Sequence, residues 1–437
     1  MVIDTVDTLL AVLRRVQLLA AAQVDEISRA LAAEYHDPYE LSSYLVEIDW
    51  LTEYQRRLLF EGRWGELNVG PYQVLDLLGE GGVGEVYKAW DTIRGRVVAL
   101  KVLRQHLAVR PEAVAELRRE RQAVIHLNHP NIIKTYDAAS VGSVHYFAME
   151  YVEGMDLHHY VQRCGPLPVE QACDYARQAA QGLQHAHQAG LVHRDVKPAN
   201  LFLINPPLAA AAAAAVRRRP PEPIVKVVDW GLARLKSAGP DGENASVFDV
   251  DAEKGLLIGT ADYIAPEQSQ DATLVDIRAD IYSLGCVLFF LLTGRPPFAG
   301  PSLMQKLLQH QDEPAPPVKS LRPDVPEELN ALLLRMMAKY PENRFQIPLL
   351  AAAALKRFCP GPGVGMAGLS GTAGGAAFRP SSSASLLRPA SNANVQRPGS
   401  AAALSRPATA PALGNPASSS NLPGPGGDSN RYPPLGR

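Results

Sequence analysis

The stretch that decides the fold lies near the middle of the chain and reads His193-Arg194-Asp195-Val196-Lys197-Pro198-Ala199-Asn200. It brings an acid, a lysine and an asparagine into one short segment. Four further motifs surround it in order, namely the glycine-rich stretch from 79 to 86, Val98-Ala99-Leu100-Lys101, Asp229-Trp230-Gly231 and Ala265-Pro266-Glu267. Five ordered motifs do not co-occur by chance, so the interpretation rests on the set and not on any one of them.

The glycine-rich stretch reads Gly79-Glu80-Gly81-Gly82-Val83-Gly84-Glu85-Val86 and fits the pattern GxGxxGxV. Glycine lets the backbone approach a phosphate group closely. A dinucleotide-binding site would need a helix directly after the glycines. Here the sequence that follows, 86 to 90, is typical of a strand, so we expect a β-hairpin.

Lys101 lies on an apolar strand, where a charged side chain is costly unless an anion pairs with it. Its expected partners are phosphate groups and one carboxylate. Glu120, in a helical stretch from 112 to 127, is the first candidate for that carboxylate, and Glu116 is the second. The alternative, that Lys101 only reaches the surface, loses weight beside the other motifs.

The order of elements along the chain predicts an α+β fold in two lobes, because strands come first and helices later. After residue 154 the sequence is mainly helical, and the apolar segment from 281 to 292 is typical of a buried helix. The strand candidates span residues 72–78, 86–90, 97–103, 132–138 and 143–151.

Together the motifs resemble those of the protein kinase superfamily, in particular the bacterial Ser/Thr kinases related to the eukaryotic ones. The resemblance covers residues 72 to about 358, with a β-rich N-lobe at 72–152 and a mainly helical C-lobe at 153–358. It implies transfer of the γ-phosphoryl group of ATP to Ser/Thr hydroxyls of protein substrates, including the chain itself, in bacterial signalling.

The same resemblance implies roles for the residues of the central motifs. Asp195 would accept the hydrogen bond of the substrate hydroxyl, and Lys197 would lie beside the transferred phosphoryl group. Asn200 and Asp229 would hold two Mg²⁺ ions. Lys197 also marks a Ser/Thr kinase rather than a tyrosine kinase.

For the nucleotide, the resemblance implies a pocket between the two lobes. Adenine would lie between Val86 and Ala99 on one side and Phe202 on the other, with a hinge at 150–152 and Met149 at the back. Lys101, held by Glu120, would contact the α- and β-phosphates. The residues expected to bind ATP are Gly79, Glu80, Gly81, Gly82, Val83, Gly84, Glu85, Val86, Ala99, Lys101, Glu120, Met149, Glu150, Val152 and Phe202.

Further positions resemble the scaffold of this family. Asp280 would brace the catalytic loop, and Arg344 would pair with Glu267. Trp230 stands where the family usually has Phe, and its large apolar ring can keep the packing role. Two alternatives stay open, a pseudokinase that only binds partners and a kinase of small molecules. Lys101, Asp195, Asn200 and Asp229 weigh against the first, and Lys197 with the segment 259–267 against the second.

Residues 1–66 are predicted to form a helical extension of three or four short helices. The repeat of apolar residues from Ile3 to Val16 is helical, Asp37 before Pro38 is an N-cap, and Thr52 can cap a further helix. A plain structural extension is the simplest interpretation. An adaptor or dimerisation role is the alternative.

Two segments have low complexity. Residues 205–223 hold an alanine run between prolines and are predicted to be a surface loop between two strands. Residues 359–437 are rich in Pro, Ala, Ser and Gly and predict a disordered tail. Arg-Pro pairs recur in it every nine residues from Arg379, each with Ser or Thr three residues after the arginine.

The tail pattern has two interpretations. Basophilic kinases favour this spacing, and Glu153 and Asp156, just after the hinge, could read the arginine. The tail would then be an autophosphorylation platform for phosphopeptide-binding partners. The alternative is a drifting repeat without function.

Bulk properties limit the partners and the location. A net charge of -2 argues against a dedicated nucleic-acid binder, and no apolar stretch is long enough to span a membrane. The four cysteines are scattered and without metal-ligand spacing, which indicates reduced thiols. We therefore expect a cytoplasmic protein, and the kinase resemblance implies that it uses ATP and Mg²⁺.

Overall fold

A computed structural model of the chain describes residues 2–31, 34–82, 84–104, 123–207, 221–230, 261–270 and 275–360. The tail, the alanine-rich part of the insertion, Val83, Glu116 and Glu120 lie outside these ranges. In the described part, no helix is long and apolar enough to cross a lipid bilayer. All four cysteines carry free thiols.

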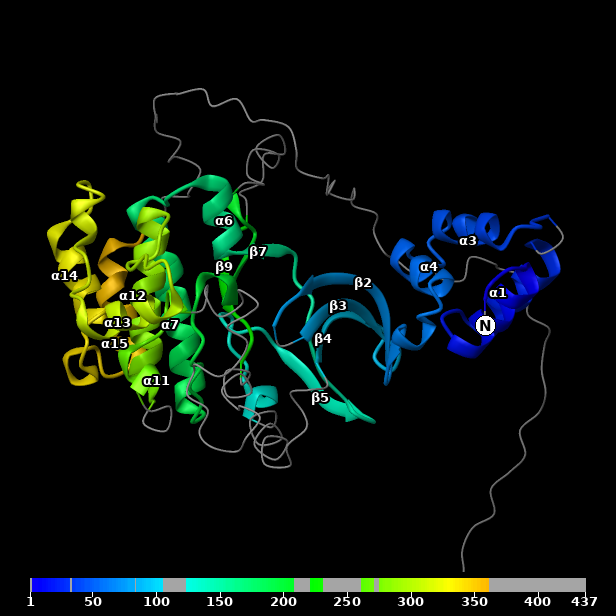
Figure 1. The fold of residues 1–437 in the computed structure, drawn as a ribbon, viewed down its shortest axis with the longest axis horizontal. Helices are drawn as coiled ribbons and strands as arrows, with labels where there is room; N and C mark the ends of the chain where they lie inside the picture. The colour runs from blue at the N-terminus through cyan, green and yellow to red at the C-terminus, as the bar shows by residue number, and fades with distance from the viewer. Residues whose placement is uncertain are drawn as a thin grey trace, which may run out of the picture. The chain divides into compact units, whose positions relative to one another are not determined.

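The chain begins with a helical module, as the sequence predicts (Figure 1). Asp37 and Thr52 cap helices at the expected places, since their side chains accept the backbone N–H groups of Tyr39 and Gln55. Buried aliphatic side chains such as Leu9, Leu41 and Leu58 form its core. The elements are α1 (Val6–Val16), α2 (Ala21–Glu26), the π-helical turn η1 (Ile27–Leu31), α3 (Pro38–Glu47) and α4 (Glu53–Phe60).

Within the described residues, six strands form an antiparallel sheet in the order β1-β2-β3-β4-β6-β5. The expected hairpin at the glycines is confirmed, because β2 pairs with β3 up to Glu80 and Glu85. The strands are β1 (Asn68–Val69), β2 (Tyr72–Glu80), β3 (Gly84–Asp91), β4 (Arg96–Leu103), β5 (Thr135–Val141) and β6 (Val144–Glu150).

Four side-chain-to-backbone hydrogen bonds attach the helical module to this sheet. Thr52 Oγ1 donates to the Leu75 carbonyl at 2.5 Å, and Gln55 Nε2 to the Val74 carbonyl at 2.8 Å. Near the end of α1, Asn68 Nδ2 donates to the Val16 carbonyl at 2.6 Å. The fourth bond joins Gln73 Nε2 to the Gln17 carbonyl at 2.7 Å. The strand β2 is therefore held from both ends of the module.

The second lobe is mainly helical, and its core surrounds α12 (Ile277–Thr293), the buried helix expected from the sequence (Figure 1). The other helices are α6 (Leu157–Cys164), α7 (Val169–Gln188), α11 (Pro266–Gln270), α13 (Leu303–Asp312), α14 (Glu327–Met336) and α15 (Pro348–Leu355). A small sheet of the strands β7 (Gly154–Asp156), β8 (Leu201–Ile204) and β9 (Ile224–Val227) completes the lobe. The two-lobed α+β fold is thus confirmed.

Two local differences from the sequence expectations have physical causes. The strand β5 begins at Thr135 and not at Ile132, because Ile132 instead forms an isolated parallel bridge with Val227. The short strand β7 was not predicted, since Gly-Met-Asp has no strand pattern. Of the helix expected at 112–127, only residues 123–126 are described, and they are helical.

Candidate active site

The segment 193–200 is held in place by the buried carboxylate of Asp280, as expected. Asp280, near the start of α12, accepts the N–H of His193 at 2.8 Å and that of Arg194 at 2.7 Å. Burial raises the pKa of Asp280, and His193 and the two backbone N–H groups oppose that rise. Arg194 has a φ of 64°, a left-handed conformation that a non-glycine residue adopts only when its surroundings enforce it.

The structure brings the three expected catalytic residues together. Asn200 Nδ2 donates to the Asp195 carbonyl at 2.7 Å and to its carboxylate at 3.1 Å. Lys197 Nζ lies 3.1 Å from the same carboxylate, whose side chain is 7% exposed. Because both donors are fixed, the carboxylate has one orientation, as a group that must receive a proton needs.

Lys101 pairs with Asp229 in this structure, with Nζ and Oδ2 2.7 Å apart. The carboxylates expected to hold Lys101, Glu120 and Glu116, lie outside the described residues. Asp229 has a φ of 66°, the second left-handed residue at the site. The pair joins β4 to the segment after β9, so it links the two lobes.

The groups beside Asp195 fit a magnesium site by their chemistry. Mg²⁺ prefers oxygen ligands and commonly uses one or two carboxylates together with substrate phosphates. Asp229 supplies a carboxylate, and the Asn200 amide, with its nitrogen used for Asp195, has its oxygen left for a cation. Among the described residues, this site included, no group of three or more His, Cys, Asp or Glu side chains is arranged to hold a metal ion by itself.

Several of the residues expected to line an adenine pocket lie close to one another. Ala99 lies opposite Met149 in the pairing of β4 with β6, and Ala99 and Val152 both pack against the buried cluster that contains Met149. The Glu150 carboxylate accepts from Lys226 Nζ at 2.6 Å and from the Lys134 backbone at 2.8 Å. The Glu150 backbone N–H also donates to the Lys134 carbonyl at 2.8 Å, so both its side chain and its N–H are used inside the protein.

Val86 and Phe202 lie on the strands expected for them but outside that apolar cluster. Val86 faces Lys101 in the pairing of β3 with β4. Phe202 lies on β8, opposite Asp156 on β7. Behind Met149 is a cavity of about 10 Å³, room for about one water molecule. It is lined by Lys101, Val124, Ile133, Thr135, Phe147, Met149, Asp229 and Trp230.

The glycines of the hairpin differ in whether the surrounding structure requires glycine at their positions. A Cβ on Gly84 would lie 2.0 Å from the Val102 carbonyl oxygen, so β3 and β4 require glycine there. A Cβ on Gly79 would meet nothing within 4 Å. Gly81 and Gly84 close the turn by exchanging backbone hydrogen bonds of 2.8 and 3.3 Å. Packing therefore explains Gly84, whereas Gly79 remains available for a ligand.

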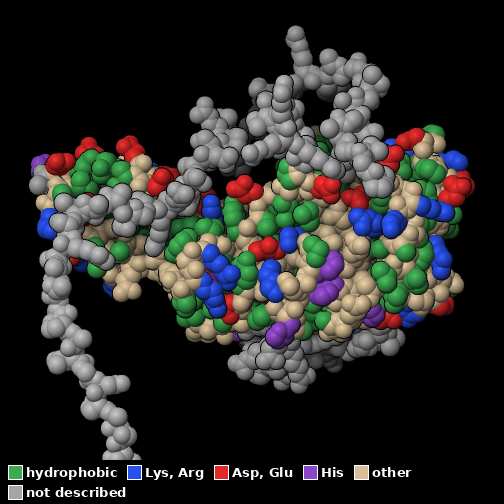
Figure 2. Space-filling view, turned by 180° about the vertical axis from the view of Figure 1, so that it is seen from behind, with side chains coloured by type: hydrophobic (Ala, Val, Ile, Leu, Met, Phe, Trp, Pro, Cys, Tyr) green, Lys and Arg blue, Asp and Glu red, His purple; other side chains and the backbone are tan. Residues whose placement is uncertain are grey.

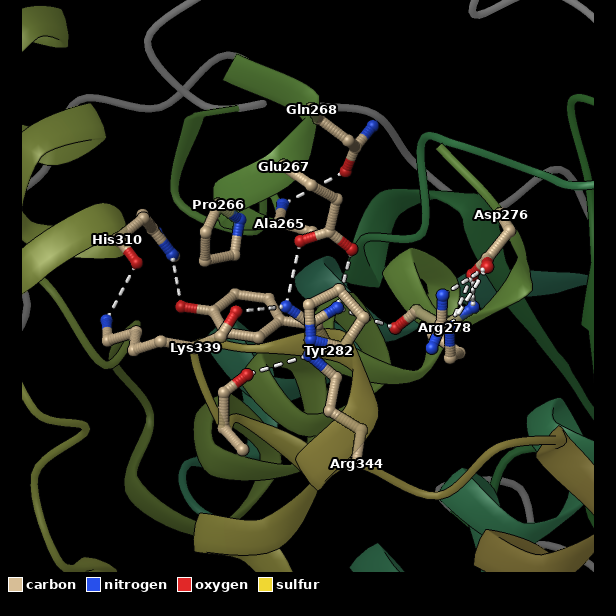
Figure 3. Close-up of polar contacts among 12 residues, drawn as sticks. Ala265, Pro266, Glu267, Gln268, Asp276, Arg278, Tyr282, His310, Lys339 and Arg344 are labelled. Carbon is tan, nitrogen blue, oxygen red and sulfur yellow. Dashed lines mark hydrogen bonds and ion pairs between the residues drawn. The ribbon is translucent and has the colours of Figure 1, made fainter. Parts of the chain in front are cut away.

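The expected pair of Arg344 and Glu267 is present and fully buried on the arginine side (Figure 3). Two guanidinium nitrogens donate to the Glu267 carboxylate at 2.6 and 2.8 Å. The same guanidinium donates to the carbonyls of Ala338, Lys339 and Arg278. All of its N–H groups are thus directed by neighbours, and the segment 265–270 is anchored to the base of the lobe.

Comparison with known proteins agrees with this geometry. The family described as "Protein kinase domain" matches residues 72–355. The chain belongs to the protein kinase family. The resemblance inferred from the five motifs is therefore confirmed.

Several bacterial kinases are similar to this kinase domain. The serine/threonine-protein kinase PknB of Mycobacterium leprae is 40% identical over 280 residues, which are 63% of this chain and 41% of that protein. PrkC of Bacillus subtilis is 36% identical over 277 residues, 63% of this chain and 39% of that protein. The chain thus spans about two fifths of the length of these relatives.

A solved structure has the same fold. The Mycobacterium tuberculosis PknI kinase domain covers 67% of this chain and 98% of its own, with 26% identity and a TM-score of 0.50.

Two positioning residues of the kinase domain were missed from the sequence. His193 Nδ1 accepts the Asp195 N–H at 3.2 Å, and Nε2 lies 2.8 Å from the Val228 carbonyl, so Nε2 carries the proton. The Trp230 ring packs on this imidazole with centroids 4.7 Å apart. Gln268 joins the Arg194 carbonyl to the Ala265 N–H, each at 2.9 Å. His193 stands inside the motif 193–200 and Gln268 directly follows the motif 265–267, but the sequence gives no signal for these contacts.

Proposed function

We propose that this chain is an active protein kinase that transfers the γ-phosphoryl group of ATP to Ser/Thr hydroxyls of proteins. The observation that carries the proposal is the fixed Asp195 carboxylate, which lies within 3.1 Å of both Lys197 Nζ and Asn200 Nδ2. A pseudokinase scaffold would have no use for this arrangement. We place the kinase domain at 72–358, between a helical module at 1–66 and the tail at 359–437.

The proposed mechanism relies on positioning. ATP and Mg²⁺, when bound, supply the transferable phosphoryl group and neutralise its charge. Asn200 and Asp229 would hold the metal ions, and Lys101 would hold the phosphates. Asp195 would accept the proton of the substrate hydroxyl and orient its oxygen, while Lys197 would offer a positive charge beside it. Because ATP is supplied inside cells, we propose that this chemistry takes place in the cytoplasm.

We further propose that the chain phosphorylates its own tail at Ser382, Ser391, Ser400 and Thr409, each three residues after an arginine. Of the two acids expected to read that arginine, Asp156 caps α6 by accepting the His159 N–H at 3.0 Å. Glu153 is exposed, so we assign the reading of the arginine to Glu153. Phosphorylated tail residues would then recruit phosphopeptide-binding partners.

The test is phosphoryl transfer from labelled ATP with Mg²⁺, comparing the wild type with Asp195→Asn. Removing the carboxylate should lower the rate by about 10²–10⁴-fold while nucleotide binding is kept. Phosphosite mapping of the same samples tests the tail proposal separately. Equal labelling of both proteins would refute the role of Asp195, and labelling of other proteins with an unmodified tail would refute only the tail proposal.

A further inference from the structure

The helical module has a groove of about 430 Å³ that the kinase domain does not use. This volume is in the range of pockets that bind small ligands or a few residues of a peptide. None of the side chains that attach the module to β2 lines it. The lining residues come from α3 and the turn before it, and they are Tyr35, Tyr39, Glu40, Ser43, Tyr44 and Glu47.

The aromatic rings of the groove are held in place by their neighbours. Tyr35 and Tyr44 stack with ring centroids 5.5 Å apart and planes at 27°. Tyr39 is 53% exposed, yet the Arg56 guanidinium lies 4.5 Å from its ring and Phe60 packs against its edge. Rigid, exposed tyrosines bind partners at a low cost in side-chain entropy.

The groove is also acidic. Glu40 and Glu47 line it, and Glu34 lies beside Tyr35 in the chain. Among the described residues, no lysine or arginine forms an ion pair with any of these three carboxylates. The nearby Arg56 is already used by Glu53, at 3.0 Å, and by Ser43, at 2.9 Å. Desolvation is the main cause that raises the pKa of the Tyr35 hydroxyl, and Tyr44 and these carboxylates raise it further.

Figure 2 shows acidic side chains next to hydrophobic ones along the upper edge of the module. A ligand that matches this surface must offer flat apolar groups and positive charge together. Proline rings pack on tyrosine faces, and an extended proline-containing peptide loses little entropy when it binds. Arginine adds a guanidinium that stacks on the same rings and pairs with carboxylates.

We propose that this groove is a docking site for an extended peptide that carries Arg-Pro pairs. The chemistry of the occupant follows from charge complementarity with Glu40 and Glu47 and from the exposed ring of Tyr39. A suitable probe is a synthetic peptide with the sequence of residues 386–400, LLRPASNANVQRPGS, which holds two such pairs. The site lies outside the catalytic machinery, so the proposal does not depend on kinase activity.

The experiment measures binding of the fluorescent peptide to the full chain by anisotropy. The chain has its own Arg-Pro pairs, so the host protein carries Arg379→Gln, Arg388→Gln, Arg397→Gln and Arg406→Gln to remove competition. We expect saturable binding. It should weaken as the salt concentration is raised from about 0.05 M to about 0.5 M, because salt screens exposed charges. Changing both arginines of the peptide to glutamine should weaken binding by about tenfold or more.

Variants of the groove test the assignment. Glu40→Gln and Glu47→Gln should each weaken binding by about two- to fivefold, and Tyr39→Ala by about threefold or more. The matched control is Glu26→Gln, an exposed acid of the same module that does not line the groove. It should bind the peptide as the unchanged host does. Circular dichroism checks that each variant keeps its helices.

A phosphorylated form of the peptide tests the role of charge independently. Phosphates at Ser391 and Ser400 add negative charge, so they should weaken binding to an acidic groove by about threefold or more. No saturable binding at a peptide concentration of about 1 mM, equal binding after Arg→Gln, or no effect of Glu40→Gln and Glu47→Gln would overturn the proposal. Tighter binding of the phosphorylated form would also contradict it, because a phosphopeptide receptor needs cations.

Discussion

The helical module and the kinase domain bury different kinds of side chain. Among the described residues of the module, the only buried polar side chains are Ser42 and Gln55, and none that is charged is buried. The kinase domain buries Lys101, Asp195, Asp280 and Arg344. Burying a charge is costly unless partners satisfy it. The difference indicates that the catalytic domain uses that cost to fix its site, whereas the module keeps its charges on the surface, where a partner can meet them.

The first prediction breaks the ion pair of the fully buried Arg344. Arg344→Met leaves the largely buried Glu267 without its cation and should lower the free energy of unfolding by about 3–5 kcal/mol. The matched control is Arg278→Met, which removes a pair with the half-exposed Asp276 and should cost less than about 1 kcal/mol. Urea unfolding measures both. Equal losses would contradict the distinction between the two pairs.

The second prediction concerns acid. Burial lowers the pKa of His310 to about 3, helped by Lys339 and Lys306, while an adjacent Asp262 backbone contact opposes the shift. The folded protein therefore keeps His310 neutral while the unfolded chain takes up its proton below pH 6.5 or so. Stability is fully present above that pH and falls as the pH drops toward 3, by up to about 1.4 kcal/mol per pH unit.

His310→Gln tests this sign, because glutamine cannot take up the proton. Urea unfolding between about pH 7.5 and 4.5 should give a pH slope smaller by about one proton in the variant than in the wild type. The hydrogen bond to Tyr282, 2.9 Å long, is lost or replaced at every pH, so it changes the stability but not the slope. Identical slopes would show that His310 is not held neutral.

The third prediction separates two glycines of one motif. Gly84→Ala forces a Cβ toward the Val102 carbonyl and should destabilise the protein by about 1–3 kcal/mol. Gly79→Ala meets open space and should leave thermal unfolding nearly unchanged. If Gly79→Ala nevertheless raises KM for ATP, the effect belongs to nucleotide binding. A loss of stability at Gly79 as large as at Gly84 would refute the packing argument.

The fourth prediction moves to the module, where we expect the smallest effects. Gln55→Ala removes the buried hydrogen bond to the Val74 carbonyl and should cost about 1–2 kcal/mol. Gln23→Ala is its matched control, since Gln23 closes a similar cap at 2.9 Å from the Ala20 N–H without touching the sheet. It should cost about 0.5–1 kcal/mol. Calorimetry measures the unfolding of both variants. Equal losses of stability would contradict the claim that Gln55 attaches the module to the sheet.

Most of the kinase fold could be predicted because its motifs combine residue type with order. Asp280 and Arg344 were assigned correctly from short segments, and the structure gives each the partner expected. The helical caps Asp37 and Thr52 could be predicted because a cap is a local interaction.

What could not be predicted depends on contacts between distant parts of the chain. The bond from Gln55 to β2 and the Tyr35–Tyr44 stack have no sequence signal, because the residues that they join belong to no motif. The pairing of Lys101 with Asp229 joins residues of two lobes and could only be seen in the structure. The strand β7 forms because β8 offers a free edge, which its own sequence does not reveal.

The most direct measurement of the central claim compares three substrate peptides that differ only in the acceptor, Ser, Thr or Tyr. Each is incubated with the full chain, labelled ATP and Mg²⁺, in parallel with Asp195→Asn. We expect label on the Ser and Thr peptides, none on the Tyr peptide, and loss of label in the variant. Equal labelling of the Tyr peptide, or transfer that persists without the Asp195 carboxylate, would contradict a Ser/Thr kinase built on this site.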